Sequence, residues 1–68
     1  MFKSENLRVI MAQTGLKLKE VAEATGVTRV TVSNWRTGRS RPYNRKVLKL
    51  STLFGVKPEY FAIPITLA

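Results

Sequence analysis

Cationic side chains are the groups in this sequence best suited to binding chemistry, and most of them lie in one stretch. Twelve Lys and Arg residues against four acidic residues give a formal net charge of +8. No acidic residue lies between Glu23 and Glu59, an interval that contains Arg29, Arg36, Arg39, Arg41, Arg45, Lys46, Lys49 and Lys57. Because ordinary solvated faces mix charges of both signs, this block indicates a surface for a polyanion, either nucleic acid or an anionic membrane. A face that only confers solubility is the alternative.

Side chains for catalysis or metal binding are scarce. The sequence has no His, Cys or Asp, and no Gly-x-x-x-x-Gly-Lys loop that would cradle a phosphate. Glu20 and Glu23 lie three residues apart, near Lys17 and Lys19, and are interpreted as ordinary surface charges. We therefore expect no enzyme, no catalytic residue, no metal, no cofactor and no small-molecule ligand.

The chain also lacks the features of a membrane or secreted protein. No apolar run approaches the ~20 residues of a transmembrane helix, and the first residues contain no long apolar stretch. A membrane-surface peptide would place its apolar residues on one amphipathic helix, whereas here they are spread along the chain. We expect a soluble, intracellular protein with no membrane partner.

Apolar residues recur at helical spacing through most of the sequence, which predicts one small all-α domain of five short helices. Ser4 is expected to cap the first helix, and glycines at 15, 26, 38 and 55 are expected to end the first four. The fourth helix starts around Tyr43 or Asn44, and Pro58 suits the first turn of the fifth. The predicted inward-facing residues are Leu7, Ile10, Met11, Val21, Ala22, Thr25, Val32, Trp35, Val47, Leu50, Ser51, Phe54, Tyr60 and Phe61.

The second and third predicted helices form a recognisable pair. The second begins near Leu18 and ends at Gly26, and Thr28 then caps a third helix that Gly38 ends. A tight turn of three or four residues containing a glycine therefore joins two short helices. This is the sequence outline of a helix-turn-helix.

The stretch from Leu16 to Gly38, LKLKEVAEATGVTRVTVSNWRTG, resembles the phage Cro/repressor (XRE-like) helix-turn-helix family. The similarity extends over roughly residues 6–61. The residues that occupy the places of the family pattern are Ala22, Gly26, Val32, Trp35 and Gly38. The resemblance implies a lambda-repressor-like fold and binding of double-stranded DNA, with the second helix of the motif in the major groove.

Two positions depart from the family pattern. The family usually has Ser or Thr followed by Gln where this chain has Lys17 and Leu18, and this predicts a helix cap weaker by about 1 kcal/mol. The missing polar side chain also commonly braces a phosphate or a recognition residue. Asn44 stands where the family often has an apolar residue.

If Val32 and Trp35 face the core, the opposite side of the same helix must face outward. Arg29 there can form two hydrogen bonds with guanine O6 and N7, and Asn34 can do the same with adenine N6 and N7. A valine methyl can contact thymine, and a hydroxyl can donate to a base or phosphate. The predicted base-contacting residues are Thr28, Arg29, Val30, Ser33 and Asn34.

A second set of residues is expected to bind the DNA backbone, because cations and polar groups in loops and helix starts can meet phosphates. Either Arg39 or Arg41 could instead enter a minor groove. As a group they should give a log–log salt dependence of about −0.9 per neutralised phosphate. The predicted backbone-contacting residues are Lys17, Lys19, Arg36, Arg39, Arg41, Tyr43, Arg45 and Lys46.

The last residues, 63–68, form an unusually apolar tail that follows a DNA-binding domain at 1–62, whose motif spans about 18–37. Such a tail is expected either to fold back onto the fifth helix or to pair with another copy. Dimers on half-sites about 34–36 Å apart are the usual solution for a small recognition helix. We therefore expect a homodimer built from the fifth helix and the tail, and a monomer that dimerises only on DNA is the alternative.

These observations lead to one expected function with alternatives. We expect a sequence-specific transcriptional regulator in the bacterial cytoplasm, a Cro-like phage or prophage repressor that binds operator half-sites as a dimer. The alternatives are a DNA-binding antitoxin or antirepressor whose main target is another protein, and the N-terminal domain of a longer repressor. RNA binding is disfavoured, because Tyr43 is the only candidate for an exposed stacking aromatic.

Overall fold

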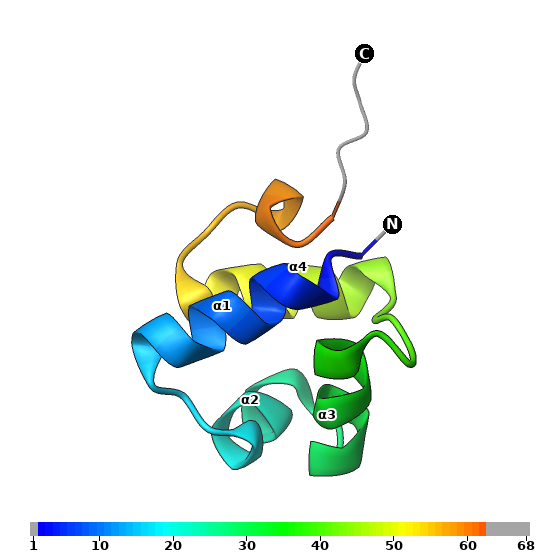
Figure 1. Ribbon diagram of the computed structural model, residues 1–68. Helices are drawn as coiled ribbons and strands as arrows, with labels where there is room; N and C mark the ends of the chain where they lie inside the picture. Colours follow the sequence, from blue (N-terminus) through cyan, green and yellow to red (C-terminus); the bar gives the residue numbers. More distant parts are fainter. Residues whose placement is uncertain (1, 63–68) are drawn as a thin grey trace.

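The computed structural model describes residues 2–62, and within this range the chain is helical (Figure 1). The elements are, in chain order, α1 (Ser4–Thr14), α2 (Leu18–Thr25), α3 (Arg29–Thr37), α4 (Asn44–Phe54) and the 3-10 turn η1 (Pro58–Tyr60). The predicted all-α class and the order of the elements are confirmed. The fifth element is a single 3-10 turn, shorter than the helix expected there. None of the helices in residues 2–62 is long and apolar enough to cross a bilayer.

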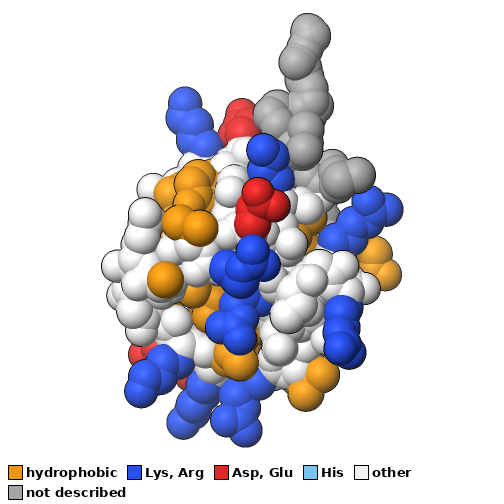
Figure 2. Space-filling model, viewed as in Figure 1, with side chains coloured by type: hydrophobic (Ala, Val, Ile, Leu, Met, Phe, Trp, Pro, Cys, Tyr) orange, Lys and Arg blue, Asp and Glu red, His pale blue; other side chains and the backbone are white. Residues whose placement is uncertain are grey.

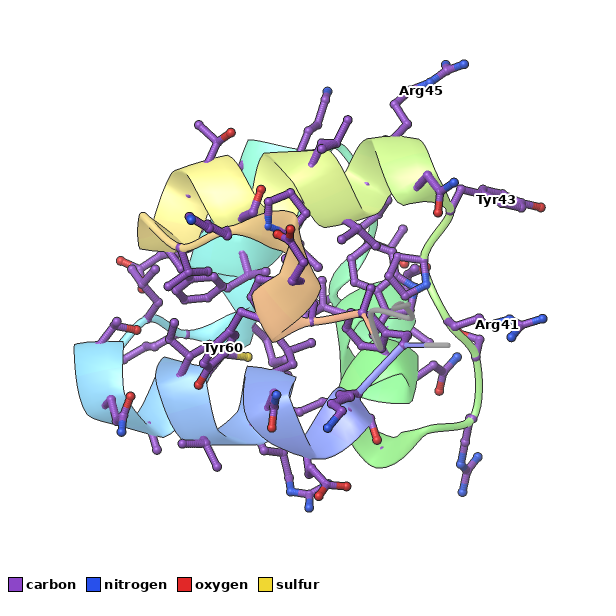
Figure 3. The ribbon with its side chains drawn as sticks, turned by 90° about the horizontal axis from the view of Figure 1, so that it is seen from above. Arg41, Tyr43, Arg45 and Tyr60 are labelled. Atoms are coloured by element: carbon purple, nitrogen blue, oxygen red, sulfur yellow. The ribbon has the colours of Figure 1, made fainter. Side chains whose placement is uncertain are left out.

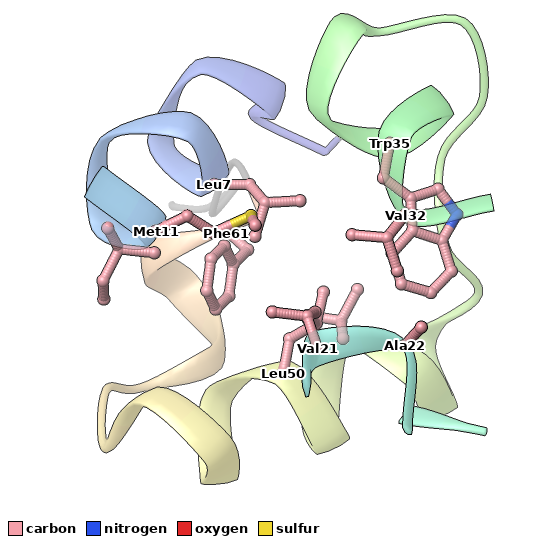
Figure 4. Packing of buried hydrophobic residues seen from close by; sticks show 10 residues of the cluster. Leu7, Met11, Val21, Ala22, Val32, Trp35, Leu50 and Phe61 are labelled. Carbon is pink, nitrogen blue, oxygen red and sulfur yellow. The ribbon is translucent and has the colours of Figure 1, made fainter. Parts of the chain in front are cut away.

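The helices pack around one shared core. α3 contacts α1 and α2, while α4 contacts α2 and η1. Figure 1 shows α1 and α4 in the upper part of the molecule, with α2 and α3 below them. The residues buried in this core are Leu7, Ile10, Met11, Val21, Ala22, Val32, Trp35, Val47, Leu50 and Phe61 (Figure 4).

The sequence pattern predicted this core with two exceptions. Phe54 and Tyr60 are only half-buried and pack against the core from its edge. Phe61 takes the central place instead, with its side chain fully buried. Its ring contacts three other aromatic rings, those of Phe2, Phe54 and Tyr60, at centroid distances of 6.0, 6.0 and 5.2 Å.

The N-terminal residues, including the first turn of α1, hold η1 and the residues that follow it. Phe2 forms an isolated antiparallel bridge with Ala62, and the Lys3 amide donates to the Phe61 carbonyl. The Asn6 side-chain amide donates to the Tyr60 carbonyl at 2.6 Å. Because η1 has only three residues, these bonds from the N-terminal segment fix its position on the bundle.

The start of α1 differs from the prediction. Lys3 occupies the capping position and Ser4 is the first helical residue, and no side chain makes a capping hydrogen bond there. Ser4 instead lies beside Gly38, where a side chain would meet the serine hydroxyl at 3.4 Å. Gly38 also has a left-handed backbone, with φ of +86°, that residues with a Cβ rarely adopt. This glycine therefore allows α3 to end close against α1.

Candidate nucleic-acid interface

The orientation of α3 is set by two buried side chains. Val32 is fully buried and Trp35 is 3% exposed, and both extend from α3 into the core near Val21 and Leu50 (Figure 4). Their spacing of three residues places both on one side of the helix. The opposite side of α3 therefore cannot face the core, as the sequence predicted.

The predicted base-contacting residues are not equally exposed. Thr28, Arg29 and Val30 are exposed at the start of α3, and Val30 is 69% exposed. Ser33 and Asn34, one turn later, are half-buried. The first turn of α3 is thus its most accessible part, and this is the part that helix-turn-helix proteins place against base edges.

Asn34 is half-buried, and its main-chain carbonyl accepts hydrogen bonds from the loop that follows α3. The Arg39 and Ser40 amides donate to the Asn34 carbonyl at 2.9 and 3.3 Å, and the Gly38 amide donates to the same oxygen. These bonds use only the main chain of Asn34. Its side-chain amide is therefore not required to hold the loop that follows α3.

Thr28 caps α3, as predicted. Its hydroxyl oxygen accepts a hydrogen bond from the Thr31 amide at 3.2 Å and lies 3.0 Å from the Thr31 hydroxyl. The Thr31 hydroxyl, which no sequence pattern indicated, is therefore a partner of the cap. The two hydroxyls together order the exposed first turn of α3.

Removing this cap is expected to destabilise the domain measurably. Thr28→Ala should lower the free energy of unfolding by about 1 kcal/mol, because the Thr31 amide loses its partner. Thr28→Ser keeps the hydroxyl and should lose much less. Urea denaturation followed by circular dichroism measures both, and equal losses for the two variants would contradict the capping role.

The loop after α3 and the start of α4 present a second group of polar side chains. Arg39, Arg41 and Arg45 are exposed, and Tyr43 is 85% exposed. Figure 3 shows that Arg41, Tyr43 and Arg45 all project away from the helical bundle. No acidic residue lies in this part of the chain, so the loop and the first turn of α4 form a cationic edge.

The start of α2 carries two further predicted backbone contacts, Lys17 and Lys19, and both are exposed. The Lys17 side chain makes no capping hydrogen bond there, as expected from a lysine at the capping position. The exposed Glu20 carboxylate accepts a hydrogen bond from the Lys17 amide at 2.7 Å, so this surface charge also has a local structural role that was not expected. A glutamate three residues after the capping position can satisfy that amide whatever the capping side chain is.

The remaining two cations of the predicted set are half-buried. Arg36 lies in the last turn of α3, and its carbonyl accepts a hydrogen bond from the Arg8 guanidinium at 3.0 Å. The Lys46 ammonium donates to the Thr25 carbonyl at 2.8 Å. Figure 2 shows Lys and Arg side chains gathered along the lower edge of the molecule, where Figure 1 places α2 and α3.

A cavity of about 670 Å³ adjoins this region. Trp35, Pro42 and Val47 supply buried parts of its lining, while Arg41 and Tyr43 stand exposed at its rim. The described residues contain no group of three His, Cys, Asp or Glu side chains that could hold a metal ion.

Comparisons with known proteins agree on the fold. A helix-turn-helix family model matches residues 7–61. Among solved structures, the P22 c2 repressor in complex with a synthetic operator has a TM-score of 0.81 at 22% identity, over 88% of this chain and 91% of that one. The similarity confirms the lambda-repressor-like fold, and a search of curated proteins finds no match.

Two other structures are similar. A transcriptional regulator from Listeria innocua has a TM-score of 0.84 at 26% identity, over 96% of this chain but 62% of that one. The restriction-modification controller protein C.AhdI from Aeromonas hydrophila has a TM-score of 0.77 at 24% identity, over 84% and 86% of the two chains. The same arrangement of helices therefore occurs in regulators of different kinds.

Proposed function

Because this chain belongs to the helix-turn-helix family of DNA-binding transcriptional regulators, which are not enzymes, we propose that it is a Cro-like phage or prophage repressor. It binds operator half-sites as a homodimer in the cytoplasm of a bacterial host. The observation that carries this proposal is the orientation of α3. Two buried side chains, Val32 and Trp35, leave Arg29 exposed on a surface without acidic neighbours in sequence.

The first turn of α3 supplies the base contacts. Arg29 reads a guanine, and the exposed methyl groups of Val30 pack on a thymine methyl. Thr28, Ser33 and Asn34 complete the set, with Asn34 reading an adenine at the more buried end of the surface. The exposure of Arg29 and Val30 and the cap at Thr28 support this assignment.

The cationic edge supplies contacts to the DNA backbone on one side of α3, and the start of α2 supplies them on the other. Exposed cations on both flanks can meet phosphates while the first turn of α3 faces the bases. Their net positive charge also speeds association with DNA. The proposed backbone-contacting residues are those predicted from the sequence except Lys46, whose ammonium is hydrogen-bonded to the Thr25 carbonyl: Lys17, Lys19, Arg36, Arg39, Arg41, Tyr43 and Arg45.

The proposed dimer uses η1 and the apolar tail. Residues 63–68, on which half of this contact depends, lie outside the described residues. Support comes from the composition of the tail and from the half-burial of Tyr60 in η1. Two copies would place two α3 helices on half-sites about one helical turn of DNA, 34–36 Å, apart.

A second candidate has a specific observation in its favour. The chain spans 62% of the length of the Listeria innocua regulator. It could therefore be the DNA-binding domain of a longer repressor, in which another domain supplies the dimer contact. Analytical ultracentrifugation of the 68-residue chain separates the two, because only the first candidate predicts a concentration-dependent dimer from this chain alone.

Selection of binding sites from random duplex DNA by the wild-type protein tests the proposed function. The expected result is a short consensus with two-fold symmetry. A pool that remains random after repeated rounds, although the protein retains it at low salt, would contradict sequence-specific recognition.

The cationic edge leads to a separate prediction about salt. Arg41→Ala is expected to weaken binding to all duplexes alike and to reduce the log–log salt slope by about 0.9, because one phosphate contact is lost. Titrations at several salt concentrations measure it, with Lys57→Ala as a control that removes the same charge elsewhere. An Arg41→Ala variant with the wild-type slope would show that Arg41 makes no phosphate contact.

A further inference from the structure

Lys46 differs from the cations that precede it at the start of α4. Arg41 and Arg45 are exposed, whereas Lys46 is half-buried and its ammonium donates to the Thr25 carbonyl at 2.8 Å. Its side chain therefore points back into the protein. One of its three ammonium donors is thus used within the protein, unlike the exposed cations of the cationic edge.

The partner of Lys46 is the last carbonyl of α2. Carbonyls at the end of a helix lack a donor within the helix, and a cation there also interacts favourably with the helix dipole. Thr25 itself is fully buried, and its hydroxyl donates to the Val21 carbonyl at 2.8 Å. The ammonium lies 3.7 Å from where a side chain at Gly26 would begin, which is an ordinary van der Waals distance.

This hydrogen bond joins two parts of the proposed interface that lie 21 residues apart in sequence. On one side is the turn at residues 26–28, which leads directly into the first turn of α3. On the other side is the first turn of α4, which follows the loop that carries Arg41 and Tyr43. The bond thereby connects the element next to the base-contacting surface with the element next to the backbone-contacting one.

We propose that Lys46 is a positioning residue for DNA recognition, and not one of the phosphate contacts. Its bond to the Thr25 carbonyl holds the turn before α3 at a set distance from the cationic edge. When the cationic edge binds phosphates, the base-contacting residues of α3 are then aligned with the edges of the bases. This inference rests on the proposed function, since it concerns how the same surface discriminates between sequences.

Lys46→Met keeps most of the side-chain length and removes the ammonium, so it tests the role directly. Affinities for the selected operator and for an unrelated duplex are measured over a range of salt concentrations. We expect the ratio of operator to unrelated affinity to fall roughly three- to tenfold, because binding groups must be held within about 0.5 Å. The salt slope on either duplex should match that of the control.

The matched control is Lys49→Met, which removes the same charge from an exposed position of α4. It should leave the affinity ratio unchanged. If Lys46→Met instead weakens both duplexes equally and reduces the salt slope by about 0.9 relative to this control, Lys46 is a phosphate contact and the proposal is wrong.

A measurement on the wild-type protein decides the matter even if Lys46→Met fails to fold. The NMR signals of the Lys46 ammonium and of the Thr25 carbonyl carbon are followed as duplex DNA is added. We expect the bond between them to persist in the complex, and its loss on binding would overturn the proposal. If the wild type shows no sequence preference, the proposed function fails, while this measurement still reports on Lys46 with any bound duplex.

Discussion

Replacing Trp35 with alanine is expected to lower the free energy of unfolding by about 3–5 kcal/mol, the cost of emptying a large aromatic site in a core. Trp35 is 3% exposed and comes from the element that must hold the recognition surface in place. Domains have a total stability of about 5–15 kcal/mol, and a chain of 68 residues lies near the lower end. Trp35→Ala should therefore be partly unfolded at room temperature, as measured by urea denaturation with circular dichroism.

Val30→Ala is the matched control on the same helix. Val30 is 69% exposed, so its truncation should change the free energy of unfolding by no more than about 0.5 kcal/mol. If Trp35→Ala were as mild as Val30→Ala, the indole would not hold α3 to the core. The orientation of the whole recognition surface would then be wrong.

The second large effect is expected in the DNA sequence preference of variants that lack a base-contacting side chain. Arg29→Ala and Asn34→Ala should each relax the selected consensus at one position, and these positions should differ. A two-point hydrogen bond between a side chain and a base contributes about 1–3 kcal/mol of discrimination, so each variant should lose roughly five- to 150-fold of preference at its position. Repeating the site selection with each variant measures this preference directly.

Neither substitution should disturb the fold. Arg29 is exposed, and the Asn34 carbonyl that holds the following loop belongs to the main chain. Arg41→Ala provides the comparison, because a phosphate contact changes affinity without changing the preferred sequence. If Arg29→Ala and Asn34→Ala both weakened binding uniformly with an unchanged consensus, neither would be a base-contacting residue.

The parts of the fold that depend on local pattern could be predicted from the sequence. The spacing of Val32 and Trp35 indicated the orientation of α3, while Gly26 indicated the end of α2 and Gly38 the end of α3, because periodicity and left-handed glycines act within a few residues. The cap at Thr28 followed from the same local rules. These features are what place Arg29 and Val30 at the surface.

The features that could not be predicted depend on contacts between distant segments. The Lys46 ammonium meets a carbonyl 21 residues earlier, and no local signal distinguishes it from the exposed Arg45. Phe2 pairs with Ala62 across the fold, and Lys3 rather than Ser4 is the residue before α1. The half-burial of Ser33 and Asn34 in the second turn of α3 was likewise not predicted.

The role of Glu20 was a different kind of omission, because a local signal was present. A capping box is normally recognised by Ser or Thr at its first position, and this chain has Lys17 there. A capping box has two hydrogen bonds, and the one formed here joins the backbone amide of the capping residue to a carboxylate three residues later. This bond does not depend on the side chain of the capping residue. Glutamate at this spacing therefore indicates a helix start even where the capping residue is unusual.

A titration of the isotope-labelled protein with the selected operator duplex, followed by NMR, tests the outward orientation of α3 most directly. We expect large shifts for the Arg29 side chain and for the amides of Thr28 and Val30, followed by those of the cationic edge. The signal of the Trp35 indole should change very little. Large shifts confined to the outer face of α1, with the first turn of α3 unaffected, would contradict the outward orientation of α3.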